Sequence, residues 1–167
     1  SDNPNKKEDE PEILFDALHH AREPLSLSQL IYFMYYICEN YSTNPEIKNL
    51  VDQIEMYFVP IVNPDGYAYN FTTNPNGGGL WRKNRRVNSN TSFGVDINRN
   101  YGKGWGYNNS GSSNNINSDV YRGPSAFSEP EIQAMRDFCN DHQFKFAMNY
   151  HTYSNLLVYP WGYLSKN

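Results

Sequence analysis

Three largely apolar runs alternate with helical patterns along the chain, and this alternation constrains the fold more than any other feature. The runs cover residues 13–18, 54–62 and 144–150 and are rich in β-branched and aromatic residues, as buried strands are. Apolar residues recur at three- and four-residue steps in the stretches 27–38 and 132–139, which is typical of amphipathic helices. Strands alternating with helices predict one α/β domain with a mixed, largely parallel sheet flanked by helices.

The starts of the two long helices are predicted from capping patterns. Ser26-Leu27-Ser28-Gln29 and Ser128-Glu129-Pro130-Glu131 each place a serine three residues before Gln or Glu, which is the form of a capping box. We expect these helices to end near Tyr41 and His142. Local patterns predict three further elements: a short helix at 46–53, a turn at 63–66 and a strand at 156–159.

Residues of metal-ligand type follow the first apolar run. His20 and Glu23 lie three residues apart at the expected junction between strand and helix, where an imidazole and a carboxylate can converge on one zinc ion. A third ligand is needed, and His151, directly after the third run, is the best candidate. All three would then lie at the carboxyl ends of strands, where α/β folds bind ligands. An isolated pair could equally be a strand-end histidine with a hydrogen-bond partner.

Composition excludes some classes of function. A net charge of −4 and a pI near 5.5 argue against nucleic acid, because no basic patch is dense enough to follow a phosphate backbone. The chain shows neither a signal peptide nor an apolar run of membrane-spanning length, so no membrane partner is expected. Arginines in expected loops, such as Arg99 and Arg122, indicate recognition of a small anion such as a carboxylate.

Two further patterns leave alternatives open. Glu8, Glu10 and Glu12 form an acidic cluster before the first strand, which could hold calcium through oxygen ligands or be a solvated turn. Cys38 and Cys139 each lie in an expected helix, where they are either buried free thiols, the reading that we favour, or one disulfide.

Six stretches resemble the zinc metallocarboxypeptidases of the carboxypeptidase A, B and T type, and they follow the family's order over nearly the whole chain. They are His-His-Ala-Arg-Glu at 19–23, Asn-Pro-Asp-Gly-Tyr at 63–67, Trp-Arg-Lys-Asn-Arg at 81–85, Val-Asp-Ile-Asn-Arg-Asn-Tyr at 95–101, Tyr-Arg-Gly-Pro-Ser-Ala-Phe-Ser-Glu-Pro-Glu at 121–131 and His-Thr-Tyr-Ser at 151–154. The paired histidines and the Asn-rich loop are most similar to the bacterial, secreted carboxypeptidase T branch.

The resemblance implies a zinc site. His20, Glu23 and His151 would be the three ligands of one zinc ion, with water in the fourth position. Asp96 would accept a hydrogen bond from the second nitrogen of His20, which fixes the tautomer of that ligand. A loop cap is the alternative role for Asp96.

The resemblance also implies substrate contacts. Arg82 would polarise the scissile carbonyl and stabilise the oxyanion. Asn98 and Arg99 would bind the terminal carboxylate of the substrate. Arg22 and Tyr153 would line the groove for upstream substrate residues, although a structural role is an equal alternative for both.

The implied activity is zinc-dependent hydrolysis of the C-terminal peptide bond of peptides and proteins, by an enzyme that is secreted, extracellular or periplasmic. The matches correspond to the middle of the family's catalytic domain. Residues 1–167 are therefore expected to be a partial catalytic domain, incomplete at both ends, with the catalytic glutamate outside the chain and the isolated chain inactive. The resemblance also implies a cis peptide bond between Thr152 and Tyr153.

Two other functions stay open at this point. Zinc amidohydrolases that remove acyl groups from amino acids share the His-x-x-Glu…His ligand set. A non-catalytic carboxypeptidase-like domain that binds peptides would share the fold. The pair Asn98-Arg99 and the stretch Trp81-Arg82-Lys83 favour the peptidase, and the intact ligand set argues against a domain that has lost catalysis.

Overall fold

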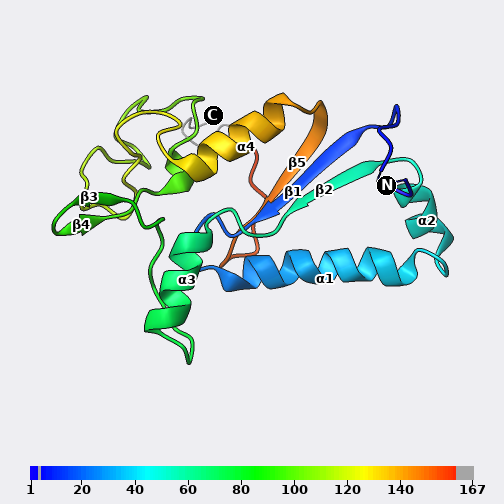
Figure 1. Ribbon diagram of the computed structural model, residues 1–167, viewed down its shortest axis with the longest axis horizontal. Coiled ribbons are helices and arrows are strands. Elements are labelled where there is room, and N and C mark those ends of the chain that lie inside the picture. Colours follow the sequence, from blue (N-terminus) through cyan, green and yellow to red (C-terminus); the bar gives the residue numbers. More distant parts are fainter. Residues whose placement is uncertain (4, 161–167) are drawn as a thin grey trace.

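A three-stranded parallel sheet forms the centre of the computed structural model, which describes residues 1–3 and 5–160. Its strands β1 (Glu12–Ala17), β2 (Glu55–Val59) and β5 (Phe144–Tyr150) lie in the order β2-β1-β5 (Figure 1). β1 is flanked on both sides and is the most buried strand. The predicted parallel sheet is confirmed, and the carboxyl ends of all three strands meet at one edge.

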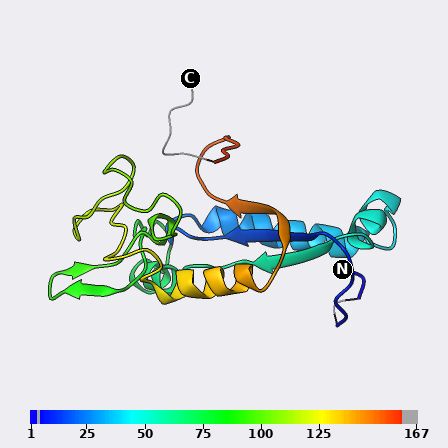
Figure 2. The same ribbon diagram turned by 90° about the horizontal axis from the view of Figure 1, so that it is seen from above.

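Helices cover both faces of this sheet. Figure 2 shows α1 (Pro24–Asn40) and α4 (Pro130–Asn140) on opposite sides of the strands. Alternate residues of β1 serve the two faces, as the pleat of a strand requires. Leu14 packs with Ile132 and Met135 on the α4 side. Phe15, Ala17 and Leu18 pack with Leu30 on the α1 side.

Both capping-box predictions are wrong. α1 begins at Pro24 and α4 at Pro130, and the residues before these prolines make no side-chain cap hydrogen bond. Proline is pre-organised for the first helical position. Because of these prolines, α1 begins two residues before Ser26 and α4 begins two residues after Ser128. Ser26 instead lies inside α1, where its hydroxyl contacts the loop before the helix.

The turn predicted at 63–66 is the first turn of a helix. α3 (Pro64–Thr73) has Asn63 as its N-cap, with the side-chain oxygen accepting from the Gly66 amide at 3.0 Å. Asparagine followed by proline favours a helix start as much as a turn, and the sequence alone does not separate the two. The short helix predicted at 46–53 is α2 (Pro45–Val51).

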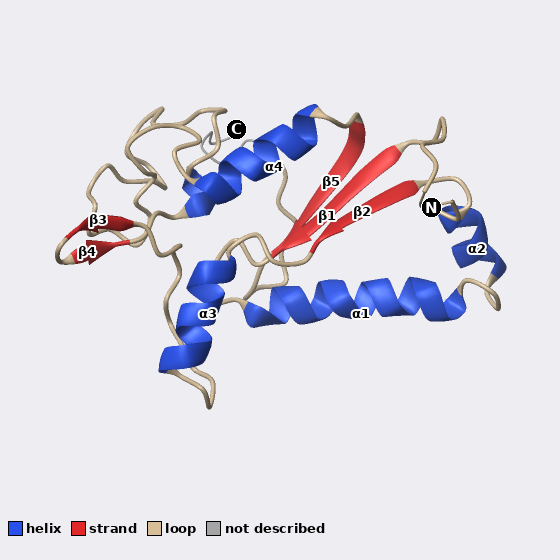
Figure 3. Ribbon diagram, viewed as in Figure 1, coloured by secondary structure: helices blue, strands red, loops and turns tan. Residues whose placement is uncertain are grey.

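The structure also differs from the predicted strands. The antiparallel pair β3 (Val87–Ser89) and β4 (Ser92–Phe93) was not predicted, because strands of three and two residues are too short to show a periodic pattern. It lies away from the main sheet (Figure 3). The predicted strand at 156–159 is absent, and its side chains are 73–79% exposed without a sheet partner. The apolar run 54–62 is a half-buried edge strand only from Glu55 to Val59. The aromatic tail at 161–163 lies outside the described residues.

Cys38 and Cys139 are both free, as favoured, but both are exposed, so the predicted burial is wrong. The neighbouring Ile37 takes the inward position on α1. Within the described ranges, no helix is long and apolar enough to cross a membrane.

Candidate metal centre

Two neighbouring strands deliver the predicted ligands to one place. His20 and Glu23 lie in the loop after β1, and His151 directly follows β5. The parallel register pairs Ala17 with Tyr150 at the ends of these strands. The loop from β1 and the first residue after β5 therefore meet at the carboxyl edge of the sheet.

The carboxylate of Glu23 joins the two histidines. Its Oε1 lies 2.8 Å from Nδ1 of His20, and its Oε2 lies 2.8 Å from Nδ1 of His151. One donor atom from each residue lies within 4.8 Å of the others. His20 and Glu23 are buried, and His151 is half-buried. Two nitrogens and one oxygen converging in this way fit the donor set that zinc prefers.

Burial and hydrogen bonding oppose each other at these ligands. Burial would raise the pKa of Glu23, but hydrogen bonds with His151 and His20 outweigh it and hold that pKa well below its usual range. Burial would lower the pKa of His20, whereas hydrogen bonds with Asp96 and Glu23 raise it. Glu23 therefore stays ionised, as a metal ligand must be.

Asp96 contacts the other side of His20. Its Oδ1 lies 3.3 Å from Nε2 of His20, and Asp96 is fully buried. Its Oδ2 accepts from Nε and Nη2 of Arg82 at 3.0 and 2.8 Å. Burial would raise the pKa of Asp96, but the contacts with His20 and Arg82 lower it. Asp96 thus lies where a partner that orients a histidine ligand is expected.

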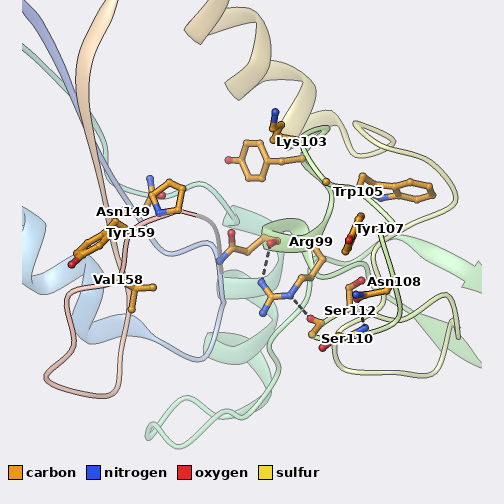
Figure 4. A pocket seen from close by; sticks show the side chains of 16 residues that line it. Arg99, Lys103, Trp105, Tyr107, Asn108, Ser110, Ser112, Asn149, Val158 and Tyr159 are labelled. Atoms are coloured by element: carbon orange, nitrogen blue, oxygen red, sulfur yellow. Dashed lines mark hydrogen bonds between the residues drawn. The ribbon is translucent and has the colours of Figure 1, made fainter. Parts of the chain in front are cut away.

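A pocket of about 550 Å³, drawn in Figure 4, is connected to this centre through the contact of Asn98 with His151. Asn98 and Arg99 line it together with the loop 103–112 and residues 158–160. The side-chain nitrogen of Asn98 lies 3.2 Å from Nε2 of His151. Arg99 donates to the carbonyl oxygens of Gly111 and Asn98 at 2.6 and 2.9 Å, and it makes no ion pair with a described carboxylate.

The remaining predicted contacts are more dispersed. Arg82 does not line this pocket; its Nη1 lies 3.3 Å from Nδ1 of His20 and 3.9 Å from Glu23. Arg22 is exposed and lies 3.6 Å from Asp119. Tyr153 is 96% exposed and is not among the residues that line this pocket. The peptide bond before Tyr153 is cis, as predicted.

A buried polar chain behind the ligands was missed. Nε2 of His19 lies 2.8 Å from the Tyr101 hydroxyl, and its Nδ1 lies 3.3 Å from Asp16. Burial raises the pKa of Asp16 to about 7, and burial together with nearby His151 and His20 lowers the pKa of His19 to about 3. The signal in the sequence was Asp16, the single charged residue of the apolar run 13–18.

Comparison with known proteins places this arrangement in a family. The family model described as zinc carboxypeptidase matches residues 1–167. The chain belongs to the zinc carboxypeptidase family. This family has the α/β fold and the zinc-dependent peptidase chemistry that the sequence predicted.

Relatives from animals and bacteria share the match. Zinc carboxypeptidase of Saccharothrix mutabilis subsp. capreolus is 40% identical over 171 residues, which cover 98% of this chain and 38% of the relative. Carboxypeptidase A2 of Mus musculus is 38% identical over 157 residues, which cover 93% of this chain and 36% of the relative. The chain thus spans less than two fifths of the length of these relatives.

Solved structures agree with the family's fold. The crystal structure of thrombin activatable fibrinolysis inhibitor superimposes with a TM-score of 0.86 and 31% identity, covering 97% of this chain and 40% of that chain. Bovine thrombin-activatable fibrinolysis inhibitor in complex with tick carboxypeptidase inhibitor gives a TM-score of 0.82 and 32% identity, covering 94% and 51%. The predicted fold class is therefore confirmed.

Proposed function

We propose that the chain is part of the catalytic domain of a zinc metallocarboxypeptidase that removes C-terminal residues from peptides and proteins. In this proposal His20, Glu23 and His151 hold one zinc ion. The observation that carries it is the Glu23 carboxylate, each of whose oxygens lies 2.8 Å from Nδ1 of one histidine. Two histidines and one glutamate are the ligand set of catalytic zinc in carboxypeptidase A, an established example of such a site.

The residues around the ligands have separable tasks. When bound, zinc would lower the pKa of a water ligand and polarise the substrate carbonyl. Oδ1 of Asp96 lies 3.3 Å from Nε2 of His20, where it would hold the proton on that nitrogen and leave Nδ1, which faces Glu23, to bind the metal. Asp96 also holds the guanidinium of Arg82 beside the ligands. From there Arg82 would donate hydrogen bonds to the oxyanion that develops on the scissile carbonyl.

Asn98 and Arg99 would bind the terminal carboxylate of the substrate. Both line the pocket, and Asn98 contacts His151. A guanidinium can bind a carboxylate through two parallel hydrogen bonds. Arg99 donates to the backbone carbonyl oxygens of Gly111 and Asn98, which leave its charge without a counter-ion among the described residues. Holding the terminal carboxylate here would position the last peptide bond over the ligands. Arg22 and Tyr153 stay predictions as contacts for upstream residues.

The predicted calcium site can include Glu8 and Glu10 but not Glu12. Glu8 and Glu10 come together with Asp2, with one oxygen of each within 4.8 Å of the others. Glu12 is buried and pairs with Lys7 at 3.1 Å instead, so its inclusion in this cluster is wrong. Calcium at Glu8 and Glu10 stays a prediction.

We also propose that the intact enzyme is secreted, extracellular or periplasmic, with peptide and protein C-termini as its substrates. The test assays the full-length enzyme on peptides with a free C-terminal carboxylate, on the same peptides with an amidated C-terminus, and on acyl-amino acids. We expect cleavage of the first set alone, because the amide removes the group that Arg99 and Asn98 would bind. Preferential hydrolysis of acyl-amino acids would identify an amidohydrolase. Binding of the peptides without cleavage would identify a non-catalytic domain.

A further inference from the structure

We propose that Ser26 and Asn63 are positioning residues that hold the loop 18–23 in the geometry that its two metal ligands require. The inference rests on the zinc site proposed above and adds two residues outside the ligand set. Both are fully buried, and each hydrogen-bonds the backbone of this loop from a different helix end. Neither was singled out as a site residue from the sequence.

The loop starts with an unfavourable backbone conformation. Leu18 has a φ of 59°, in the left-handed region that residues with a side chain rarely adopt. Such a conformation persists only where its surroundings enforce it. Here it turns the chain sharply after β1, so that His20 and Glu23 face the end of β5.

Ser26 ties the two ends of the loop together from the α1 side. Its hydroxyl accepts from the Leu18 amide at 3.2 Å and donates to the Glu23 carbonyl oxygen at 2.7 Å. One hydroxyl therefore satisfies the backbone of the left-handed residue and of the ligand Glu23. Removing it would leave the Leu18 amide buried without this partner, which is costly.

Asn63 holds the same loop from the α3 side. Its side-chain amide donates to the His19 carbonyl oxygen at 3.0 Å, and its backbone amide donates to the Leu18 carbonyl oxygen at 3.1 Å. Its Oδ1 is already used as the cap of α3, where it accepts from Gly66. The peptide groups on either side of His19 are thus anchored, next to the ligand His20.

Close packing leaves the loop little freedom to relax. A Cβ added to Gly66 would lie 2.8 Å from Cβ of Ala21 and 2.4 Å from the Lys83 carbonyl oxygen. The first turn of α3 therefore packs directly against the loop 18–23, with no space for a side chain at Gly66. Metal ligands need support of this kind, because small displacements weaken a metal site, and loss of a supporting partner typically lowers metal affinity by about 10- to 100-fold.

The test compares zinc affinity, by chelator competition, with thermal stability and with the visible spectrum of the cobalt-loaded protein. Ser26→Ala removes the hydroxyl, and Ser26→Thr retains it. Asn63→Asp keeps the cap oxygen for Gly66 but loses the donor to His19. Asn70→Ala is the matched control, because Asn70 is also buried and makes two side-chain hydrogen bonds, at 2.8 and 3.0 Å, to the backbone of Trp81.

We expect Ser26→Ala and Asn63→Asp to bind zinc about 10- to 100-fold more weakly, with shifted cobalt bands, and Ser26→Thr to stay within about threefold of wild type. Asn70→Ala should lose thermal stability without losing zinc affinity. Wild-type zinc affinity and cobalt bands in Ser26→Ala and Asn63→Asp would overturn the proposal. If Ser26→Ala does not fold, Asn63→Asp decides, because it preserves the helix cap.

A further variant separates this proposal from the zinc site on which it rests. His20→Ala should abolish tight zinc binding. Unchanged binding in His20→Ala would mean that the ligand set is wrong. Lost binding in His20→Ala, with normal binding in Ser26→Ala and Asn63→Asp, would mean that the ligands are correct and only the positioning role is wrong.

Discussion

The side-chain amide of Asn98 lies 3.2 Å from Nε2 of His151, on the edge of the imidazole that faces away from Glu23. A single ring therefore separates the metal centre from the pocket that Asn98 and Arg99 line. His151, the first residue after β5, thus contacts both Asn98 of the proposed carboxylate-binding site and Glu23 of the proposed metal site. This proximity is what exopeptidase specificity requires.

Asp96→Asn tests the support of His20. The change removes the negative charge that faces Nε2 of His20 at 3.3 Å, so we expect zinc affinity to fall about 10- to 100-fold. The measurement is chelator competition at fixed pH. Asp52→Asn is the control, because Asp52 carries a comparable ion pair, with Lys48, on the surface. A normal zinc affinity in Asp96→Asn would leave Asp96 only its role as a loop cap, in which its Oδ1 accepts from the Asn98 amide at 3.1 Å.

Arg99→Ala tests the carboxylate clamp in the full-length enzyme. Loss of charge-assisted hydrogen bonds to the substrate should lower kcat/KM for peptides by about 10- to 100-fold. Zinc content should be unchanged, because Arg99 contacts Gly111 and Asn98 and no ligand. Parallel loss of zinc and activity would show that Arg99 is structural.

Asp16 should make stability depend on pH. Burial raises its pKa from 3.8 to about 7 in the folded chain, so the folded state binds more protons than the unfolded state between about pH 4 and 7. This group therefore lowers the free energy of unfolding as pH rises through that window, by at most about 4 kcal/mol. Asp16→Asn should remove this decrease in the free energy of unfolding between low and high pH. Urea unfolding of the wild type and the variant at pH 5 and pH 8 measures the difference. An unchanged pH slope in Asp16→Asn would contradict the raised pKa.

The 167-residue chain should bind zinc but hydrolyse peptides poorly. The carboxylates beside the proposed ligands are engaged: both oxygens of Glu23 contact histidines, and Asp96 pairs with Arg82. No described carboxylate is left there as a general base, which contributes about 10²- to 10⁴-fold. Release of C-terminal amino acids should be measured beside a zinc carboxypeptidase of full family length. Comparable turnover would place a base among these paired groups.

The parts of the structure that depend on local patterns were predictable from the sequence. The strands around Leu14, Phe58 and Met148 have apolar runs, and His20, Glu23 and His151 were proposed as ligands because they follow such runs. Ser26 was assigned to a cap that it does not form, because its actual partner, the Leu18 amide, becomes adjacent only when the chain turns. Helix and turn compete for Asn63-Pro64 at the level of sequence, and packing decides between them.

The features that the sequence did not predict depend on contacts between residues far apart in the chain. Asp96 and Arg82 came from resemblance, since nothing in their local sequence predicts that Asp96 would be fully buried between Arg82 and His20. β3 and β4 have three and two residues, which is too short for a periodic signal in the sequence, and they pair Val87 with Phe93 and Ser89 with Ser92. Residues 156–159 were predicted as a strand from their apolar character alone. They are exposed because a strand also needs a neighbouring strand to pair with, which local sequence does not show.

Glu23 and His151 are separated by 128 positions in the chain, and this separation gives the metal a part in folding as well as in chemistry. Bringing such distant residues together costs chain entropy that local contacts do not repay. A zinc ion bound by both residues would link the loop after β1 to the end of β5, the last strand of the sheet in sequence order. It would stabilise the paired form of β5, because a ligand that binds only the folded form stabilises it by mass action. Stripping the metal should therefore increase amide hydrogen exchange first in β5, while the amides bonded between β1 and β2, whose pairing closes a much shorter stretch of chain, remain protected.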